Sequence, residues 1–196
     1  MDFTLSKEHE MAKKLFSDFA ENEVKPLAIE TDETEQFPKE TVSKMQKIGF
    51  MGIPIPKEYG GQGCDPLTYV MCVEELSKVC ATTGVIVSAH TSLCCDPILT
   101  YGTEEQKQKY LKPLASGEML GAFALTEPGA GTDAQGAQTK AVLDGDGGGV
   151  VEVDRLIIIG HIIIGGSVAQ SQRAICVLYQ SKGQFLTRGN EHLFQI

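Results

Sequence analysis

The sequence predicts an α+β protein in which a helical domain, residues 1–116, is followed by a β domain, residues 117–196. Two observations support this prediction. Up to Leu114, apolar residues recur at the three- and four-residue spacing of amphipathic helices. After the Ser116-Gly117 pair, short apolar runs are separated by glycine-rich turns, which is typical of strands. At 196 residues, the chain is long enough to bury a substantial core.

The first part of the helical domain is expected to contain two helices and a loop. Ser6 can cap the first helix, and Pro26 prevents a long continuation of it. A second helix is expected to begin near Pro38, because a proline fits the first helical turn, and to stop before Gly49. The segment 52–63 holds too many prolines and glycines for a helix or a strand, so an ordered loop is expected there.

Three more helices and a set of strands are expected after this loop. One helix opens at Pro66, and the apolar stretch 85–99 predicts a buried central helix. Thr103 and Gln106 have the spacing of a capping box, which predicts the start of a fifth helix. The expected strands are 119–125, 139–143, 150–153, 156–159 and 174–179.

The composition argues against several classes of function. A net charge of -9 disfavours attraction to nucleic acid or to an anionic membrane. The six cysteines form no Cys-x-x-Cys pair, so the spacing of a zinc site is absent. The N-terminus does not read as a secretory segment, so we expect reduced thiols and a cytoplasmic location. The longest aliphatic stretch, 156–164, is shorter than the roughly 18 residues of a membrane helix.

A dense group of turn residues and small hydroxyl side chains follows the predicted strand 119–125. Residues 124–136 read Ala-Leu-Thr-Glu-Pro-Gly-Ala-Gly-Thr-Asp-Ala-Gln-Gly. Taken alone, 129–134 fits the Gly-x-Gly-x-x-Gly/Ala fingerprint of NAD-binding Rossmann proteins, with Asp154 at the expected distance. A Rossmann fold is nevertheless disfavoured. The residues after the glycines lack the apolar stripe of a helix, and the first half of the chain has no alternating strands and helices.

The residues of this stretch fit two further interpretations. In one, it is a simple turn in which Thr132 and Asp133 bond their own backbone and the glycines supply positive φ. In the other, the hydroxyls of Thr126 and Thr132 and the amides of the Gly-Ala-Gly turn form a set of donors for carbonyl and phosphate oxygens. A flat polar ring with a pyrophosphate tail would use such a set.

The stretch 124–136 resembles the flavin-binding signature of the acyl-CoA dehydrogenase family, Gly/Ala/Cys-Leu-Thr-Glu-Pro-x-Ala-Gly-Thr/Ser-Asp-x-x-Gly, and it satisfies every fixed position. The likeness extends through most of the first 146 residues and is strongest toward short-chain, butyryl-CoA-type members. Outside the signature, it is carried by segments 21–28, 56–61, 73–77, 88–93 and 101–107.

The resemblance implies an all-helical N-terminal domain, a partial antiparallel β domain, and FAD as the cofactor. It also implies that Phe123, Leu125 and Thr126 line the flavin ring, and that Gly131 and Thr132 contact the pyrophosphate. Thr132 would also touch the acyl-CoA substrate. The reaction implied is the α,β-dehydrogenation of a short-chain acyl-CoA, with electrons passed to an electron-transferring flavoprotein. Full-length members are expected to be homo-oligomers.

One further segment, 91–98, looks like the family's helix beside the acyl cavity, although core packing explains its apolar residues equally well.

The resemblance stops near residue 147, and the tail 147–196 is atypical. The family's Lys-x-Phe/Trp-Ile-Thr-Asn strand, whose aromatic residue and threonine pack against the flavin, is not found there. A shifted reading frame, a chimera or a decayed gene would each produce such a tail. The family's catalytic base is a glutamate of a C-terminal helical domain, so no residue of this chain is assigned that role, and Glu127 is expected to hold the turn. We therefore expect an inactive chain, and the alternative is a non-catalytic module that binds flavin, acyl-CoA or a partner chain.

Overall fold

The computed structural model describes residues 4–124, 129, 131–133, 141–144, 148–151, 174–180, 184–187 and 194–195. The helical segments are α1 (Lys7–Phe19), η1 (Ala20–Val24), α2 (Lys25–Thr34), α3 (Lys39–Lys47), η2 (Phe50–Gly52), η3 (Lys57–Tyr59), α4 (Pro66–Val79), α5 (Ala81–Ser88), η4 (Ala89–Cys95), α6 (Asp96–Tyr101), α7 (Glu104–Gln106), η5 (Lys107–Leu111) and α8 (Lys112–Ala115). The strands are β1 (Leu120–Ala124), β2 (Ala141–Asp144), β3 (Gly148–Val151), β4 (Ala174–Gln180), β5 (Gln184–Thr187) and β6 (Phe194–Gln195).

The first helix begins where the sequence predicts but continues further. Ser6 caps α1, since its Oγ accepts a hydrogen bond from the His9 N–H at 3.2 Å. The prediction that Pro26 prevents a long continuation is wrong, because helical structure runs on through η1 and α2. In the π-helical turn η1, the Lys25 N–H bonds the Ala20 carbonyl, one residue further back than in an α-helix. Proline lacks an N–H and clashes with the carbonyl four residues earlier, and the wider turn accommodates it.

The other predicted helices are confirmed, with one difference. α3 ends before Gly49, and α4 begins at Pro66. Thr103 and Gln106 form both hydrogen bonds of the capping box that starts α7. The helix predicted at 85–99 is longer and less uniform than expected, because α5, η4 and α6 follow one another and η4 is a π-helix.

Two clusters of buried side chains stabilise the helical part. In the first, the rings of Phe16 and Phe19 each meet the Phe50 ring in an edge-on arrangement, with 5.1 Å between centroids. The second cluster joins the loop before η3 to η4, α6, η5 and α8, and it includes Ile55, Cys94, Cys95, Ile98, Leu111 and Leu114. Burial of this apolar surface is the main stabilising contribution to the helical part. The irregular segment expected at 52–63 is confirmed, with η3 as a single turn inside it.

The described strands form two sheets. β2 and β3 pair in antiparallel fashion, and the other four strands form a sheet in the order β1-β4-β5-β6. The β4–β5 and β5–β6 pairs are antiparallel, whereas β1 and β4 run parallel with Leu120 opposite Ala174. A parallel pair needs a long crossover connection, and the chain from 125 to 173 is long enough to provide it. The predicted α+β fold class is confirmed, with a mixed sheet in place of a purely antiparallel one. The predicted strand 156–159 lies outside the described residues.

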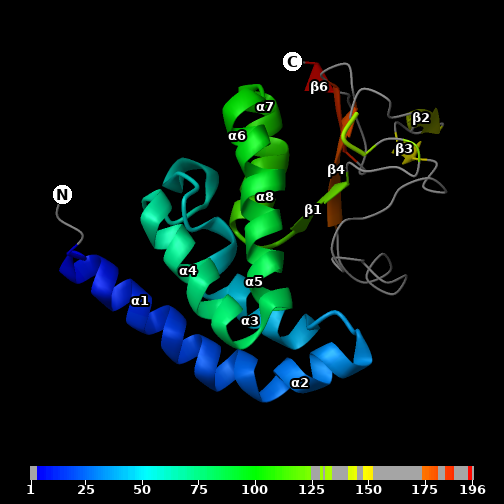
Figure 1. Ribbon diagram of the computed structural model, residues 1–196. Helices are drawn as coiled ribbons and strands as arrows, with labels where there is room; N and C mark the ends of the chain where they lie inside the picture. Colours follow the sequence, from blue (N-terminus) through cyan, green and yellow to red (C-terminus); the bar gives the residue numbers. More distant parts are fainter. Residues whose placement is uncertain are drawn as a thin grey trace.

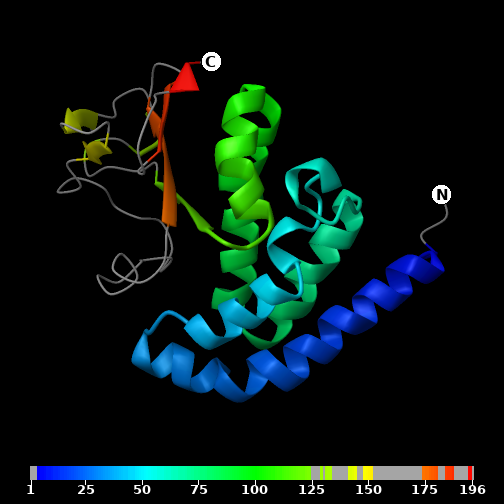
Figure 2. The same cartoon turned by 180° about the vertical axis from the view of Figure 1, so that it is seen from behind.

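The strands lie beside one face of the helical part. In Figure 1, α6, α7 and α8 stand between α4 and the strands, and Figure 2 shows the same arrangement from behind. The helical part ends with α8, and β1 begins after a short turn that contains Gly117, whose φ is 81°. Within the described residues, none of the helices combines the length and the apolar character that crossing a bilayer requires.

Candidate functional site

β1 leads directly into the segment 124–136 and is packed against the π-helix η4. The Gly121 N–H donates a hydrogen bond to His90 Nδ1, with 2.9 Å between the two nitrogens. A Cβ atom added at Gly121 would clash with the Cys94 side chain and lie 3.3 Å from His90 Nδ1. A side chain at position 121 would therefore push the strand away from η4, which explains why a glycine stands there.

His90 is fully buried, and its surroundings keep it neutral. Burial lowers the pKa of its imidazole from 6.5 to about 4, although hydrogen bonding with the backbone of Leu114 and Met51 acts in the opposite direction. Because Nδ1 accepts the Gly121 N–H, the ring proton resides on Nε2, which lies 3.4 Å from Cys95 Sγ. Burial also raises the pKa of Cys95, so its thiol stays protonated and is no nucleophile.

Thr91, the next residue of η4, has an unsatisfied side chain. It is 2% exposed, and its Oγ1 has no hydrogen-bond partner within the described part of the chain. Of the predicted acyl-cavity segment 91–98, Thr91, Cys94, Cys95 and Ile98 are buried in the core, whereas Leu93 is 43% exposed. Core packing therefore explains the buried members of this segment, and the exposed members leave the acyl-cavity interpretation as a prediction.

The predicted flavin-binding residues fall into two groups. Phe123 is half-buried on β1, and Gly131 and Thr132 are exposed in the loop that follows. Leu125 and Thr126 lie outside the described residues, as does Glu127. The structure therefore brings Phe123 to the end of β1, and it places Gly131 and Thr132 where a ligand could reach them.

Within the described residues, no packing contact requires a glycine at position 129 or 131. A Cβ added at Gly129 or Gly131 meets no atom within 4 Å, and neither residue has a positive φ. Gly129 lies in a turn and residues 131 and 132 lie in bends, so the simple-turn interpretation stays a prediction, although neither glycine has the positive φ that it expects. Open space beside an exposed backbone suits a ligand that approaches the amides closely, as the pyrophosphate of FAD would.

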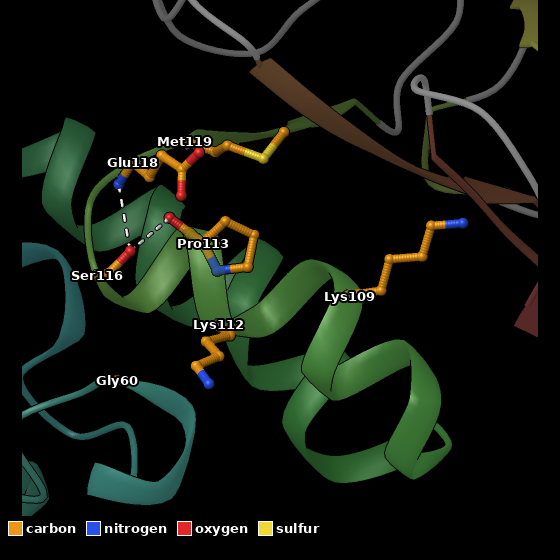
Figure 3. Close-up of a pocket in the computed structure, with 7 residues that line it drawn as sticks. All are labelled: Gly60, Lys109, Lys112, Pro113, Ser116, Glu118 and Met119. Atoms are coloured by element: carbon orange, nitrogen blue, oxygen red, sulfur yellow. Dashed lines mark hydrogen bonds between the residues drawn. The ribbon is translucent and has the colours of Figure 1, made fainter.

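A cavity of about 440 Å³, which the sequence did not predict, lies where α8 gives way to β1. Ser116 Oγ lies at its edge, donating to the Pro113 carbonyl at 3.2 Å and accepting from the Glu118 N–H at 3.4 Å (Figure 3). In Figure 3, the side chains of Lys109 and Lys112 extend in different directions, so they do not converge as a phosphate site would require. The lining residues are Gly60, Lys109, Lys112, Pro113, Ser116, Glu118 and Met119.

Several other segments of the family resemblance have structural roles. Tyr59 Oη donates to Glu104 Oε2 at 2.9 Å, which joins the segments 56–61 and 101–107. The hydrogen bond raises the pKa of Tyr59, and the bonds from Gln108 and Tyr59 lower the pKa of Glu104. Glu75 is buried in α4 and paired with Lys78 at 2.7 Å. In the described residues, no group of three or more His, Cys, Asp or Glu could hold a metal ion.

The protein-family model for the acyl-CoA dehydrogenase N-terminal domain matches residues 6–118, more than half of this chain. This chain belongs to the acyl-CoA dehydrogenase family. The short-chain-specific acyl-CoA dehydrogenase of Clostridium acetobutylicum is 64% identical over 146 residues, which cover 74% of this chain and 38% of that protein. The resemblance predicted from the signature and its surroundings is therefore confirmed, and it concerns the N-terminal half of the family.

Two solved acyl-CoA dehydrogenases share the fold. Butyryl-CoA dehydrogenase from Megasphaera elsdenii has a TM-score of 0.79 at 34% identity, and the match covers 100% of this chain and 50% of that one. An acyl-CoA dehydrogenase from Bacillus anthracis, solved in complex with FAD, has a TM-score of 0.73 at 33% identity, with 90% of this chain and 29% of that one covered. This acyl-CoA dehydrogenase chain thus spans half or less of the length of these relatives.

Proposed function

We propose that this chain forms the helical domain, 1–116, and part of the β domain, 117–196, of an FAD-dependent short-chain acyl-CoA dehydrogenase. The reaction of the whole protein is the α,β-dehydrogenation of a short acyl-CoA thioester to the 2-enoyl-CoA. The observation that carries the proposal is the complete signature at 124–136, which follows β1 and presents Gly131 and Thr132 with open space beside the glycine. The FAD-complexed relative supports the choice of cofactor.

Five residues would hold the cofactor. Phe123, Leu125 and Thr126 would line the ring, and the amide of Gly131 and the hydroxyl of Thr132 would donate to the pyrophosphate. Thr132 would also contact the acyl-CoA. When bound, the flavin would supply the hydride acceptor that no amino-acid side chain provides. The exposure of Gly131 and Thr132 fits this role, because both can donate without first breaking a contact within the described fold.

No residue of this chain is assigned as the base that removes the α proton of the thioester. The family resemblance assigns that proton transfer to a glutamate in a C-terminal helical domain, whereas the matched residues 6–118 belong to the N-terminal domain. We therefore expect the chain to bind FAD without steady turnover. For the whole protein, an electron-transferring flavoprotein as electron acceptor, assembly as a homo-oligomer and a cytoplasmic location are further parts of the proposal.

Titration of the purified chain with FAD, followed by flavin fluorescence and visible absorbance, tests the proposal. Saturable FAD binding, with no steady oxidation of butyryl-CoA when a dye acceptor is present, supports it. NAD binding without FAD binding would instead favour the Rossmann interpretation. Steady turnover would show that this chain contains a base after all. Binding of neither dinucleotide would overturn the assignment of the flavin site and leave only a role in binding another protein chain.

A further inference from the structure

We propose that His90 is a positioning residue for the flavin-binding segment. Its Nδ1 accepts a hydrogen bond from the Gly121 N–H, and this bond fixes the position of β1, from which the signature continues. This inference rests on the proposed function, because it concerns the same flavin site. It adds a residue outside the signature, in the π-helix η4, whose contact with β1 is part of the described structure.

The hydrogen bond between Gly121 and His90 lies close enough to the signature to affect the position of its first residues. Gly121 is the second residue of β1, and the signature begins at Ala124, the last. A strand rises about 3.3 Å per residue, so only about 10 Å of regular chain separates the bond from the signature. An error in the position of Gly121 would therefore be transmitted along a short, stiff segment to the residues that would line the flavin.

In the part of the chain that the structure describes, β1 has a strand neighbour on one side only. In the described part of the chain it is the first strand in the order β1-β4-β5-β6, so β4 is its one strand neighbour there. A strand at the end of a sheet leaves some N–H and C=O groups without ladder partners. The imidazole gives the Gly121 N–H a partner from the helical domain, and so it ties the strand to η4 as well as to β4.

The surroundings of His90 favour an acceptor and exclude water. His90 is 0% exposed and Gly121 is buried, so no solvent molecule can replace the imidazole without a rearrangement. The neutral ring has one acceptor nitrogen, and this nitrogen faces the strand. Cys94 packs beneath Gly121 and fixes the distance between strand and helix, because any side chain at position 121 would strike its sulfur.

The test compares His90→Asn with His90→Leu in the 196-residue chain. Asparagine offers a carbonyl oxygen near the place of Nδ1, whereas leucine fills similar volume without an acceptor. We expect His90→Leu to weaken FAD binding at least about tenfold and His90→Asn to stay within about threefold of the unsubstituted chain. Phe16→Leu removes a ring contact with Phe50 and leaves both residues of the hydrogen bond unchanged, so it serves as the control for a general loss of stability.

The hydrogen bond itself has a spectroscopic readout that does not depend on FAD. In the 15N-labelled chain, a scalar coupling across the bond between the Gly121 amide nitrogen and His90 Nδ1 is expected, and its absence would overturn the proposal even if His90→Leu fails to fold. Equal FAD affinity in the unsubstituted chain and His90→Leu would overturn it as well. So would equal losses in the Asn and Leu variants, because a packing role alone would explain them.

The proposal can fail separately from the function on which it rests. If the unsubstituted chain binds no FAD, the proposed function is overturned, and the positioning role falls with it even where the coupling is observed. If the unsubstituted chain binds FAD and only the comparison of variants fails, the proposed function stands and the role of His90 is rejected.

Discussion

Replacing Gly131 with alanine should weaken FAD binding, and replacing Gly129 with alanine should not. The two glycines nevertheless have similar surroundings in the structure. Both are exposed, neither has a positive φ, and a Cβ at either meets no atom within 4 Å. The difference between them comes from the signature, in which Gly131 occupies a fixed position and Gly129 the variable one. The two variants therefore form a matched pair that separates flavin binding from folding.

Neither substitution should destabilise the chain. Where the native backbone conformation suits alanine, replacing glycine lowers the entropy of the unfolded chain and adds about 0.4–1 kcal/mol to the free energy of unfolding. In a protein of this size, that corresponds to a rise in Tm of roughly 1–4 °C. Differential scanning fluorimetry without ligand measures this effect, and we expect the same small rise or no change for both variants.

The two variants should differ in their affinity for FAD. At Gly131 the added methyl group would occupy the open space through which the pyrophosphate reaches the backbone amide, so we expect Kd to rise at least about tenfold, or ~1.4 kcal/mol. At Gly129 we expect a change below about twofold. Fluorescence titration measures both constants. Equal affinities for the two variants would refute this account, and a fall in Tm for either would show that the glycines serve the fold.

Three further outcomes are expected. Gly121→Ala should lower the free energy of unfolding, measured by urea denaturation, by ~1–3 kcal/mol, because the added methyl group would overlap with the Cys94 side chain. An unchanged midpoint of the urea transition would contradict the close packing of β1 on η4. Phe50→Ala should cost ~3–5 kcal/mol in the same assay, because it removes two edge-on ring contacts, including that with Phe16; a loss below ~1 kcal/mol would contradict this packing. Stability should also fall as pH drops from about 6.5 to about 4, because in that window the unfolded chain protonates His90 and the folded chain, with the pKa lowered to about 4, does not. The loss should reach ~3 kcal/mol at most, at ~1.36 kcal/mol per pKa unit, and an identical pH profile for His90→Asn would refute its origin in this residue.

Features fixed by local chemistry could be predicted from the sequence, and features fixed by distant contacts could not. Ser6 and the Thr103 capping box start helices because their hydrogen bonds reach only three residues along the chain. Pro26 was misjudged because a π-helical turn, which no simple residue pattern marks, accommodates it. The parallel pairing of β1 with β4 joins residues about fifty positions apart, and no local residue pattern specifies a contact over that separation.

The same distinction applies to the site. The signature was found because its residues are adjacent in sequence, and the exposure of Gly131 and Thr132 agrees with the predicted role. The sequence did not single out His90, because its hydrogen-bond partner Gly121 is 31 residues away and its role depends on a single acceptor nitrogen. A lone histidine inside an apolar helix was the only signal, and it becomes informative once the strand that needs an acceptor is known to pack there.

The glycines give an independent reason to locate function at 124–136. Every glycine up to position 121 has a purpose in the fold, either a positive φ, as at Gly117, or a neighbour where a Cβ would go, as at Gly61 beside the Ile55 carbonyl. Gly129 and Gly131 have neither. Glycine costs unfolded-state entropy, and at position 129, which the signature leaves variable, alanine should serve as well. At position 131, which the signature fixes as glycine, a ligand that approaches the backbone amide gives the bare backbone a use that the described fold does not.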